Sequence, residues 1–304
     1  MSAPVRVLER GAPGWPESLA HLGLGEPEHL HVRAERALAV VCAPPSVAMV
    51  GARSPSAAGE RFARTLAREL AEAGVSVISG LALGIDAACH AGALDGGGRT
   101  VAVLGCGIDR DYPRRNAQLA KRIATDGAIV SEWGAGVEPA PWRFPVRNRI
   151  VAALAQATVV VEATRRSGAL ITADHALAIG RDVLAVPGAP WLELGAGTLE
   201  LLRAGAAPVG SAADVLDALG VQMELEPARR EPPAGVAGTL WAELRRHPRT
   251  RDGLALATGI AADIASGALA ELELDGLVVE ERNGTLSALE PQRTSRLNSS
   301  GGGA

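Results

Sequence analysis

The middle of the chain alternates between short runs that are apolar at every position and longer segments whose apolar residues recur at helical spacing. The apolar runs predict buried strands, at 47–50, 75–78, 101–104, 128–130, 158–162 and 183–186. The segments between most of them predict helices, at 57–73, 86–94, 114–125, 147–156 and 169–180. Strands that are apolar throughout need cover on both faces, and the helices provide it. The pattern therefore predicts an α/β fold: a Rossmann-like, mainly parallel sheet with helices on both faces.

Composition divides the rest of the chain. The first part is rich in Pro, Gly and His, and we expect it to pack on the core as an extension. A Pro-rich linker follows the repeating region. After the linker the chain has three short helical patterns and then two alternating runs joined by Asn283-Gly284, a hairpin signal. Three helices followed by a hairpin predict a small winged-helix domain. The last residues form a Ser/Gly tail that we expect to be disordered. The resulting segments are the N-terminal extension (1–45), the Rossmann-like domain (46–220), the linker (221–238), the winged-helix domain (239–290) and the tail (291–304).

Three short loops of small residues and arginine lie beside expected strands. They are Val50-Gly51-Ala52-Arg53-Ser54, Ile78-Ser79-Gly80-Leu81 and Arg166-Ser167-Gly168-Ala169. The carboxyl ends of parallel strands share one edge of a sheet, where ligands bind in this fold class. Small residues let the backbone approach a ligand closely, and helix starts favour an anion. Because no phosphate-loop lysine is present, we expect a phosphate-bearing ligand held by backbone N–H groups and Arg side chains.

The segment Phe144–Ile150 places positive charge at an expected helix start. Pro145 favours the first turn of a helix, so Arg147, Asn148 and Arg149 are predicted to lie in that turn. Two arginines there oppose the helix dipole, which favours a bound anion nearby. The alternative is that they pair with carboxylates elsewhere in the chain: Asp109, Asp111 or Glu132.

Two aromatic residues and a second arginine pair extend this basic region. Trp142 and Phe144 flank the first arginines, and aromatic rings beside Arg offer a stacking surface for unpaired bases. The alternative is that both rings are ordinary core or interface residues. Arg165 and Arg166 precede the third loop and again place positive charge beside a helix start. A solvated charge pair is the alternative there.

Asp86 and His90 lie four residues apart on one face of an expected helix that follows Gly84. Gly84, Asp86 and His90 could support the preceding loop structurally. Asp86 and His90 could instead form an acid–base pair, but we favour the structural role. No further ligand lies at metal-binding spacing, so we expect no metal. The dinucleotide pattern G-x-G-x-x-G is absent, since Gly105-Cys106-Gly107 lacks the third glycine, and we expect no cofactor.

Charge is distributed unevenly, although the net charge is only −4. Residues 141–190 hold six arginines against three carboxylates, whereas residues 235–290 hold five arginines against nine carboxylates. The basic charge therefore belongs to the Rossmann-like domain. Three cysteines without C-x-x-C spacing fit a reducing compartment, and neither a signal-peptide pattern nor a long apolar segment occurs. We expect a cytoplasmic protein that does not contact a membrane.

Taken together, the motifs resemble those of the DNA-processing protein A (DprA/Smf) family over about residues 14–210. The matching segments are 14–19 (GWPESL), 50–56 (VGARSPS), 79–90 (SGLALGIDAACH), 103–109 (VLGCGID), 112–113 (YP), 131–132 (SE), 144–149 (FPVRNR), 162–163 (EA), 167–173 (SGALITA) and 185–188 (AVPG). The resemblance implies a Rossmann-like homodimer that binds single-stranded DNA and loads RecA recombinase during natural transformation, without catalysis. It implies that the strand contacts Gly51, Arg53, Ser54, Ser79, Gly80, Phe144, Arg147, Asn148, Arg149, Arg166, Ser167 and Gly168.

The winged helix is similar to the C-terminal domain of some members of this family, but its third helix is acidic. The acidic residues are Asp263, Glu271, Glu273 and Asp275. Phosphate contact needs Lys or Arg, so we expect this domain to bind protein or to regulate, and not to hold DNA strongly.

An enzyme is the alternative function. The small-residue loops also resemble those of nucleotide phosphoribohydrolases of the lysine-decarboxylase-like group. The segment 166–174 lacks the catalytic Glu of their Pro-Gly-Gly-x-Gly-Thr-x-x-Glu motif, which weighs against this reading.

Overall fold

The chain divides into a larger unit, Met1–Met223, and a smaller unit, Glu224–Ala304, which are described separately below. The structure is a computed structural model and describes residues 3–221, 233–274, 277–281 and 284–288. The predicted tail at 291–304 and most of the predicted linker lie outside the described residues.

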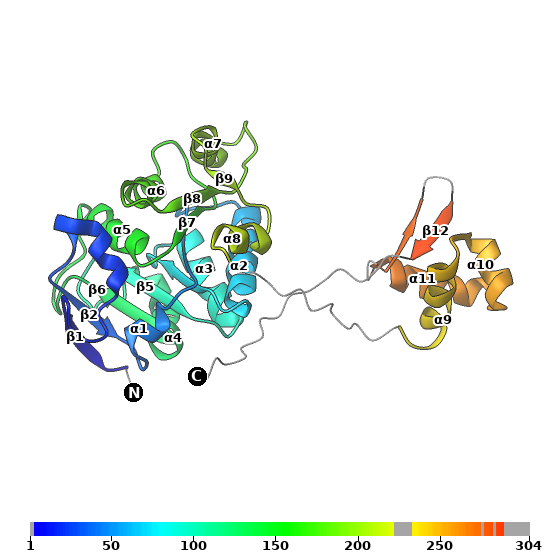
Figure 1. Ribbon diagram of the computed structural model, residues 1–304, viewed down its shortest axis with the longest axis horizontal. Coiled ribbons are helices and arrows are strands. Elements are labelled where there is room, and N and C mark those ends of the chain that lie inside the picture. The colour runs from blue at the N-terminus through cyan, green and yellow to red at the C-terminus, as the bar shows by residue number, and fades with distance from the viewer. Residues whose placement is uncertain (1–2, 222–232, 275–276, 282–283, 289–304) are drawn as a thin grey trace. The chain divides into compact units, whose positions relative to one another are not determined.

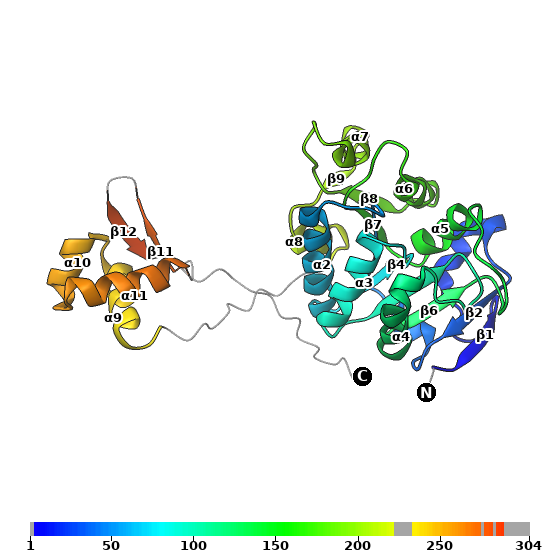
Figure 2. The same ribbon diagram turned by 180° about the vertical axis from the view of Figure 1, so that it is seen from behind.

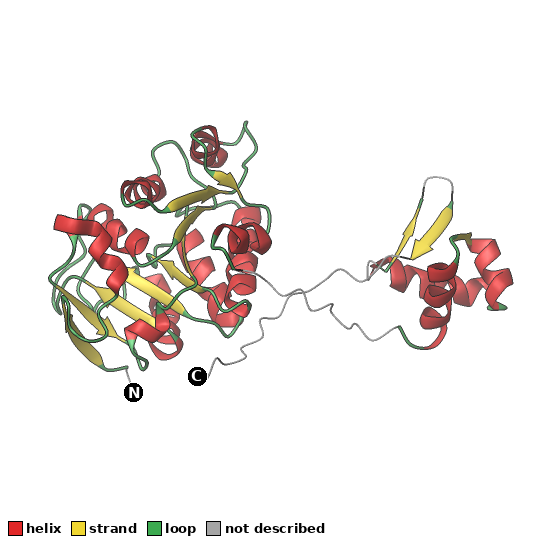
Figure 3. Ribbon diagram, in the orientation of Figure 1, coloured by secondary structure: helices red, strands yellow, loops and turns green. Residues whose placement is uncertain are grey.

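A nine-stranded sheet forms the centre of the larger unit (Figure 1; Figure 3, yellow). Its strands are β1 (Val5–Glu9), β2 (His29–Arg33), β3 (Ser46–Val50), β4 (Ser76–Ser79), β5 (Thr100–Leu104), β6 (Ala128–Ser131), β7 (Ala157–Val160), β8 (Asp182–Ala185) and β9 (Ala207–Pro208). Their order across the sheet is β1-β2-β6-β5-β4-β3-β7-β8-β9. The seven strands from β3 to β9 pair with one another in parallel. At one edge of the sheet, β2 pairs antiparallel with β6, and β1 pairs antiparallel with β2. The predicted Rossmann-like α/β fold is confirmed.

Helices cover both faces of this sheet (Figures 1 and 2). One face carries α2 (Ala57–Glu72), α3 (Ile85–Asp95), α4 (Ala117–Asp126) and α8 (Ala212–Ala218). The other carries η1 (Glu17–Gly25), α1 (Leu38–Val41), α5 (Arg143–Ala153) and α6 (Gly168–Ala178), and α7 (Ala196–Arg203) packs beside β8. Successive strand residues enter opposite cores: Ala48 and Val50 pack on the α5–α6 side, whereas Val47 and Met49 pack on the α2–α3 side.

The strand order reverses between β3 and β7. From β3 the chain builds outward through β4, β5 and β6, and it then crosses back to add β7, β8 and β9 on the other side of β3. Loops that leave neighbouring strands toward opposite sides open a crevice at the carboxyl ends of those strands, and ligands of open α/β sheets bind there. The fold therefore places its expected ligand site beside β3 and β7.

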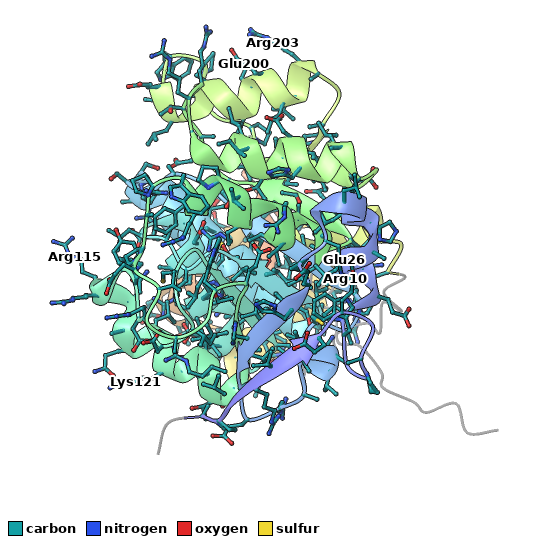
Figure 4. All side chains as sticks on the ribbon, turned by 90° about the vertical axis from the view of Figure 1, so that its left-hand side faces the viewer. Arg10, Glu26, Arg115, Lys121, Glu200 and Arg203 are labelled. Carbon is teal, nitrogen blue, oxygen red and sulfur yellow. The ribbon has the colours of Figure 1, made fainter. Side chains whose placement is uncertain are left out.

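Residues 3–45 contribute two strands to the sheet and are not only a cover on it. β2 pairs antiparallel with β6, and β1 pairs with β2. Leu19 of η1 is fully buried, and the indole N–H of Trp15 donates to Glu26 Oε1 at 2.9 Å. Arg10 lies 3.7 Å from the Glu26 carboxylate, and both are labelled in Figure 4. The sequence pattern missed β1 and β2 because their residues are mostly polar or half-exposed.

The smaller unit is a winged helix. Its elements are α9 (Gly235–Arg246), β10 (Arg249–Thr250), α10 (Arg251–Thr258), α11 (Ala262–Leu274), β11 (Val278–Glu280) and β12 (Thr285–Ala288). The predicted hairpin pairs Val279 with Ser287, and Leu240, Leu254 and Leu286 are fully buried in a separate core. Among the described helices none is by itself long and apolar enough to cross a membrane; α10 and α11, bent by 114°, pass only as a pair, by length and composition.

Candidate functional site

A cavity of about 240 Å³ opens at the carboxyl ends of β3, β4 and β7, where the strand order reverses. All three loops predicted from the sequence reach it, together with one side of α5. Among its lining residues are eight of the twelve predicted contact residues: Gly51, Arg53, Gly80, Phe144, Arg147, Asn148, Ser167 and Gly168. The tertiary structure therefore brings together residues that lie more than a hundred positions apart in the chain.

The other four predicted contact residues lie outside this lining. The Ser79 side chain is buried, and its hydroxyl donates to the Met49 carbonyl oxygen at 2.6 Å, which holds β4 to β3. Ser54 and Arg166 are exposed. No ion pair involves Arg166 within the described ranges, so its charge stays available beside the third loop. Arg149 is considered with its helix below.

The loop after β3 packs closely against α3 and carries one arginine, Arg53, that forms no ion pair with the described residues. A Cβ atom on Gly51 would lie 2.7 Å from Cγ1 of Ile85, so glycine is required where this loop passes α3. Arg53 is exposed and forms no ion pair among residues whose placement is described. Its guanidinium lies 5.6 Å from the centroid of the Phe144 ring, which is cation–π distance. Arg53 can therefore bind an anion while its guanidinium contacts the Phe144 ring, which forms the aromatic wall of the cavity.

The helix that follows this loop, α2, does not offer its start to a ligand. The Glu162 carboxylate accepts the Ser56 backbone N–H at 2.9 Å and the Ser56 hydroxyl at 2.6 Å. The Ser56 hydroxyl in turn accepts the Gly59 N–H at 2.9 Å, which caps the helix. A carboxylate of the protein itself already occupies this position. Anion binding at the start of α2, which the loop pattern predicts, is therefore not supported by the geometry.

The start of α6 is open to the cavity. Ser167 caps the helix through the Ala169 N–H at 3.3 Å, and no acidic residue lies in the first turn. Gly168 and Thr172 also line the cavity, and a Cβ atom on Gly168 would meet nothing within 4 Å. The amide of Asn148 donates to the Gly168 carbonyl oxygen at 3.2 Å, which ties α5 to this loop. Unpaired N–H groups at a helix start favour an anion, so this is the strongest anion position of the three loops.

The predicted register of α5 is wrong. The helix begins at Arg143, so Pro145 occupies its third position, and Arg147, Asn148 and Arg149 lie beyond the first turn. Proline is tolerated in the first turn because an N–H there has no partner within the helix, so it marks the start of a helix only to within a few residues. The argument from the helix dipole therefore does not apply to these arginines.

Arg147 supports the floor of the cavity with a buried charge. Its guanidinium donates to the Gly80 carbonyl oxygen at 2.8 Å and also to that of Val103. The Asp86 carboxylate accepts the backbone N–H groups of Gly80 and Ala82, each at 3.2 Å. Burial lowers the pKa of Arg147 to about 10, and burial raises the pKa of Asp86 against the opposing effect of the Arg147 charge. Arg147 holds the second loop by its Gly80 carbonyl oxygen, and Asp86 holds it by its N–H groups.

Arg149 pairs with Glu132, which is the alternative to anion binding that the sequence analysis gave for this arginine. Its Nη2 lies 2.6 Å from Glu132 Oε1, and its Nε donates to the Gly25 carbonyl oxygen at 2.8 Å. The side chain therefore joins α5 to η1 and to the loop after β6. It carries no uncompensated charge toward the cavity.

Neither Gly84 nor His90 lines the cavity, and their predicted role in supporting the second loop stays a prediction. Nδ1 of His90 lies 2.7 Å from the Thr100 hydroxyl, which itself donates to the Val77 carbonyl oxygen at 2.7 Å. The hydroxyl proton is used, so Nδ1 is the donor. Burial lowers the pKa of His90 to about 3, which keeps the ring neutral. Gly84 has φ +79°, a conformation that favours glycine. Among the described residues, no group of three or more His, Cys, Asp or Glu could hold a metal ion.

A second, smaller cavity of about 90 Å³ lies beside the first and is mostly apolar. Phe144 and Arg53 line both cavities. Tyr112 lines the second, and its ring stacks on Phe144 with centroids 5.7 Å apart and an interplanar angle of 27°. Tyr112 was not among the predicted contact residues, although it is the single tyrosine of a chain with few aromatic residues and lies in one of the matching segments.

Comparison with known proteins matches both units. The model of the DNA recombination-mediator protein A family matches residues 6–220, and that of the DprA winged helix domain matches residues 224–284. Protein Smf of Synechocystis is 36% identical over 272 residues, which cover 78% of this chain and 68% of that protein. A putative DNA processing protein DprA of Mycobacterium tuberculosis is 45% identical over 244 residues, 77% of this chain and 62% of that protein. The chain thus spans about two thirds of the length of these relatives.

Two solved structures of DNA processing protein A are similar to this chain in fold and sequence. The X-ray structure of DNA processing protein A from Streptococcus pneumoniae has a TM-score of 0.66 and 37% identity, covering 70% of this chain and 73% of that chain. A structure of DNA processing protein A from Helicobacter pylori, titled for its single-stranded DNA binding mode, has a TM-score of 0.64 and 29% identity, covering 72% of this chain and 98% of that chain. The chain belongs to the DNA recombination-mediator protein A family.

Proposed function

We propose that this protein binds single-stranded DNA across the cavity at the β3–β7 reversal and delivers it to recombination without covalent chemistry of its own. The observation that carries the proposal is the cavity lining: an open helix start, a free arginine and an aromatic wall within one hollow. The similarity to a Helicobacter pylori protein whose structure is titled for single-stranded DNA binding supports the same ligand.

Each component suits one part of an unpaired strand. The start of α6 and the Arg53 guanidinium suit phosphates, since both supply N–H donors to an anion. Phe144 suits a base, because its half-buried ring lines the cavity and stacking on an aromatic ring does not depend on base sequence. Arg147 remains with its internal partners and contributes a positive potential below the floor. A duplex shields its bases, so the aromatic wall favours a single strand.

Fluorescence anisotropy with labelled oligo-dT and with duplex of equal length tests this proposal at two or more salt concentrations. We expect tighter binding of the single strand, with an affinity that falls as salt rises by roughly 0.7 in the logarithmic slope for each phosphate contacted. Equal affinity for duplex, or an affinity that does not change with salt, would contradict the proposal.

We further propose a RecA-type recombinase as protein partner, a homodimer as the working form, and action in the cytoplasm. Membership of a recombination-mediator family supports the first point. Light scattering on the purified chain tests the dimer, and transfer of a labelled strand to RecA tests the partner. A monomer at micromolar concentration, or no effect on RecA filament growth, would contradict the respective point.

The alternative, an enzyme similar to phosphoribohydrolases, gains no support from the cavity. Asp86 is the only carboxylate among the lining residues, and it is buried and accepts two backbone N–H groups. Release of free base from a nucleoside monophosphate, abolished by Asp86→Ala, would restore this alternative.

A further inference from the structure

Two tryptophans and an arginine form a second aromatic cluster outside the cavity. The Arg143 guanidinium lies 4.9 Å from the centroid of the Trp142 ring and 5.9 Å from that of the Trp133 ring. The two indole rings meet edge to face, with centroids 6.5 Å apart and an interplanar angle of 86°. Trp142 is nevertheless 58% exposed. The arginine therefore contacts both rings and leaves much of one of them in solvent.

The cluster is held in place by its own contacts. Arg143 donates to the Glu138 carbonyl oxygen, which fixes the guanidinium over the rings. The Glu138 carboxylate pairs with Arg110 at 2.8 Å, so this acidic group does not stand unpaired beside the cluster. An exposed indole loses the free energy that burial of its apolar surface would give. A fixed, exposed ring beside a cation is a stacking surface that is ready for a ligand.

The cluster lies on the same edge of the sheet as the cavity. Trp133 follows β6, and Trp142 directly precedes α5, two residues before Phe144. In the sheet, β6 is separated from β3 by β5 and β4, a span of about 14 Å at the usual strand spacing. A DNA strand that leaves the cavity past Phe144 toward the β6 side of the sheet therefore runs toward the cluster.

We propose that Trp133, Trp142 and Arg143 form a second base-stacking subsite for the same single strand, beyond the cavity on the β6 side. The inference rests on the proposed function, since it extends the path of the same ligand. The exposed face of Trp142 stacks on an unpaired base, and Arg143 supplies positive charge beside the adjoining phosphate. The subsite takes any base, because stacking does not read hydrogen-bonding edges.

Anisotropy with Trp142→Ala and Trp142→Phe tests the subsite on long oligo-dT and on the same strand with abasic positions at one end. We expect Trp142→Ala to weaken binding of the intact strand by about 5- to 150-fold, the range that corresponds to loss of one stacked base. Trp142→Phe should keep most of the affinity. The loss caused by Trp142→Ala should shrink on the strand whose abasic end lies over the cluster.

Trp191→Ala is the matched control, since Trp191 is 81% exposed and lines neither cavity described above. An equal loss in Trp191→Ala, or an equal loss on intact and abasic strands, would overturn the subsite. Arg53→Ala separates the two proposals. If Arg53→Ala weakens binding and Trp142→Ala does not, the cavity stands and the subsite fails. If the unaltered protein does not bind the strand, the proposed function itself fails.

Discussion

Arginines that look alike in the sequence have different surroundings in the structure. Arg147 is buried and donates to backbone carbonyl oxygens, and Arg149 pairs with Glu132. Arg53 and Arg166 are exposed and have no ion pair within the described part of the chain. A phosphate can be held only by an arginine whose donors are not already used. At the residue scale, we therefore expect affinity for the proposed ligand to depend most on Arg53, which lines the cavity, whereas Arg166 does not.

We expect Arg53→Ala to lower single-strand affinity by roughly 10- to 100-fold, because hydrogen bonds to charged groups are worth about 1.5–3 kcal/mol. The salt slope should also become shallower, since a phosphate contact is lost. Anisotropy at several salt concentrations measures both quantities. Arg203→Ala is the control: Arg203 is also exposed, lies at the end of α7 and projects away from the sheet (Figure 4). Unchanged affinity in Arg53→Ala would remove it from the site.

His90 predicts how stability responds to pH. Its pKa is lowered to about 3 in the folded protein, whereas an unfolded histidine titrates near 6.5. Because the unfolded chain takes up this proton first, stability falls as the pH drops from about 6.5 toward about 3. Urea unfolding of His90→Gln should therefore show a shallower loss of stability over this pH range than the unaltered protein. Parallel curves for the two proteins would contradict the role assigned to His90.

At the scale of elements, two helices with similar starts behave differently. Both α2 and α6 follow a strand of the sheet and are capped by serine, Ser56 and Ser167. Glu162 fills the start of α2, whereas no acidic residue enters the first turn of α6. The sequence could not distinguish them, because Glu162 comes from another strand, more than a hundred residues along the chain. Anion binding by a loop of small residues therefore depends on what the neighbouring strand supplies.

Ser167→Asp tests the open helix start. Aspartate caps a helix as well as serine does, so the thermal unfolding midpoint should stay the same or rise. The added negative charge repels a phosphate at the same place, and we expect single-strand affinity to fall about 10-fold or more. Thr250→Asp is the control, because Thr250 caps α10 by accepting the Gly253 N–H at 3.2 Å and does not line the cavity. Equal affinities for Ser167→Asp and the unaltered protein would show that no phosphate lies at the start of α6.

At the scale of the whole molecule, the two units differ in available positive charge. In the winged helix, Arg249 pairs with Glu243 at 2.6 Å, and Arg251 pairs with both Glu273 and Glu280. The exposed side of α11 carries Asp263 and no arginine or lysine. The smaller unit also exposes Arg246 at the end of α9. That it binds protein or regulates, rather than holding DNA strongly, stays a prediction.

A chain that ends after Val221 should keep most of the single-strand affinity, because the larger unit has its own cores and the whole cavity. Anisotropy on this shortened chain and on the full chain measures the difference, and circular dichroism confirms that the shortened chain is folded. Loss of most of the affinity in a folded shortened chain would place a major DNA contact in the winged helix.

Much of the fold and of the cavity was predictable from the sequence. Strands that are apolar at every position and helices with one apolar face have only a few ways to bury that surface, so the covered parallel sheet follows from local pattern. The three loops met at one edge because parallel strands all end there. The register of α5 was not predictable, since Pro145 marks a helix start only approximately.

The sequence by itself determined the layers, the winged helix and the edge of the sheet at which the cavity lies. Only the tertiary structure decided which charges face that cavity. Whether Arg147, Arg149 or Arg53 is free depends on Gly80, Glu132 and the aromatic wall, which come from distant segments. The pattern of apolar and polar residues along a segment predicts which of its side chains are buried. Charge pairing cannot be predicted in this way, because the partner residues come from distant segments that only the three-dimensional fold brings together.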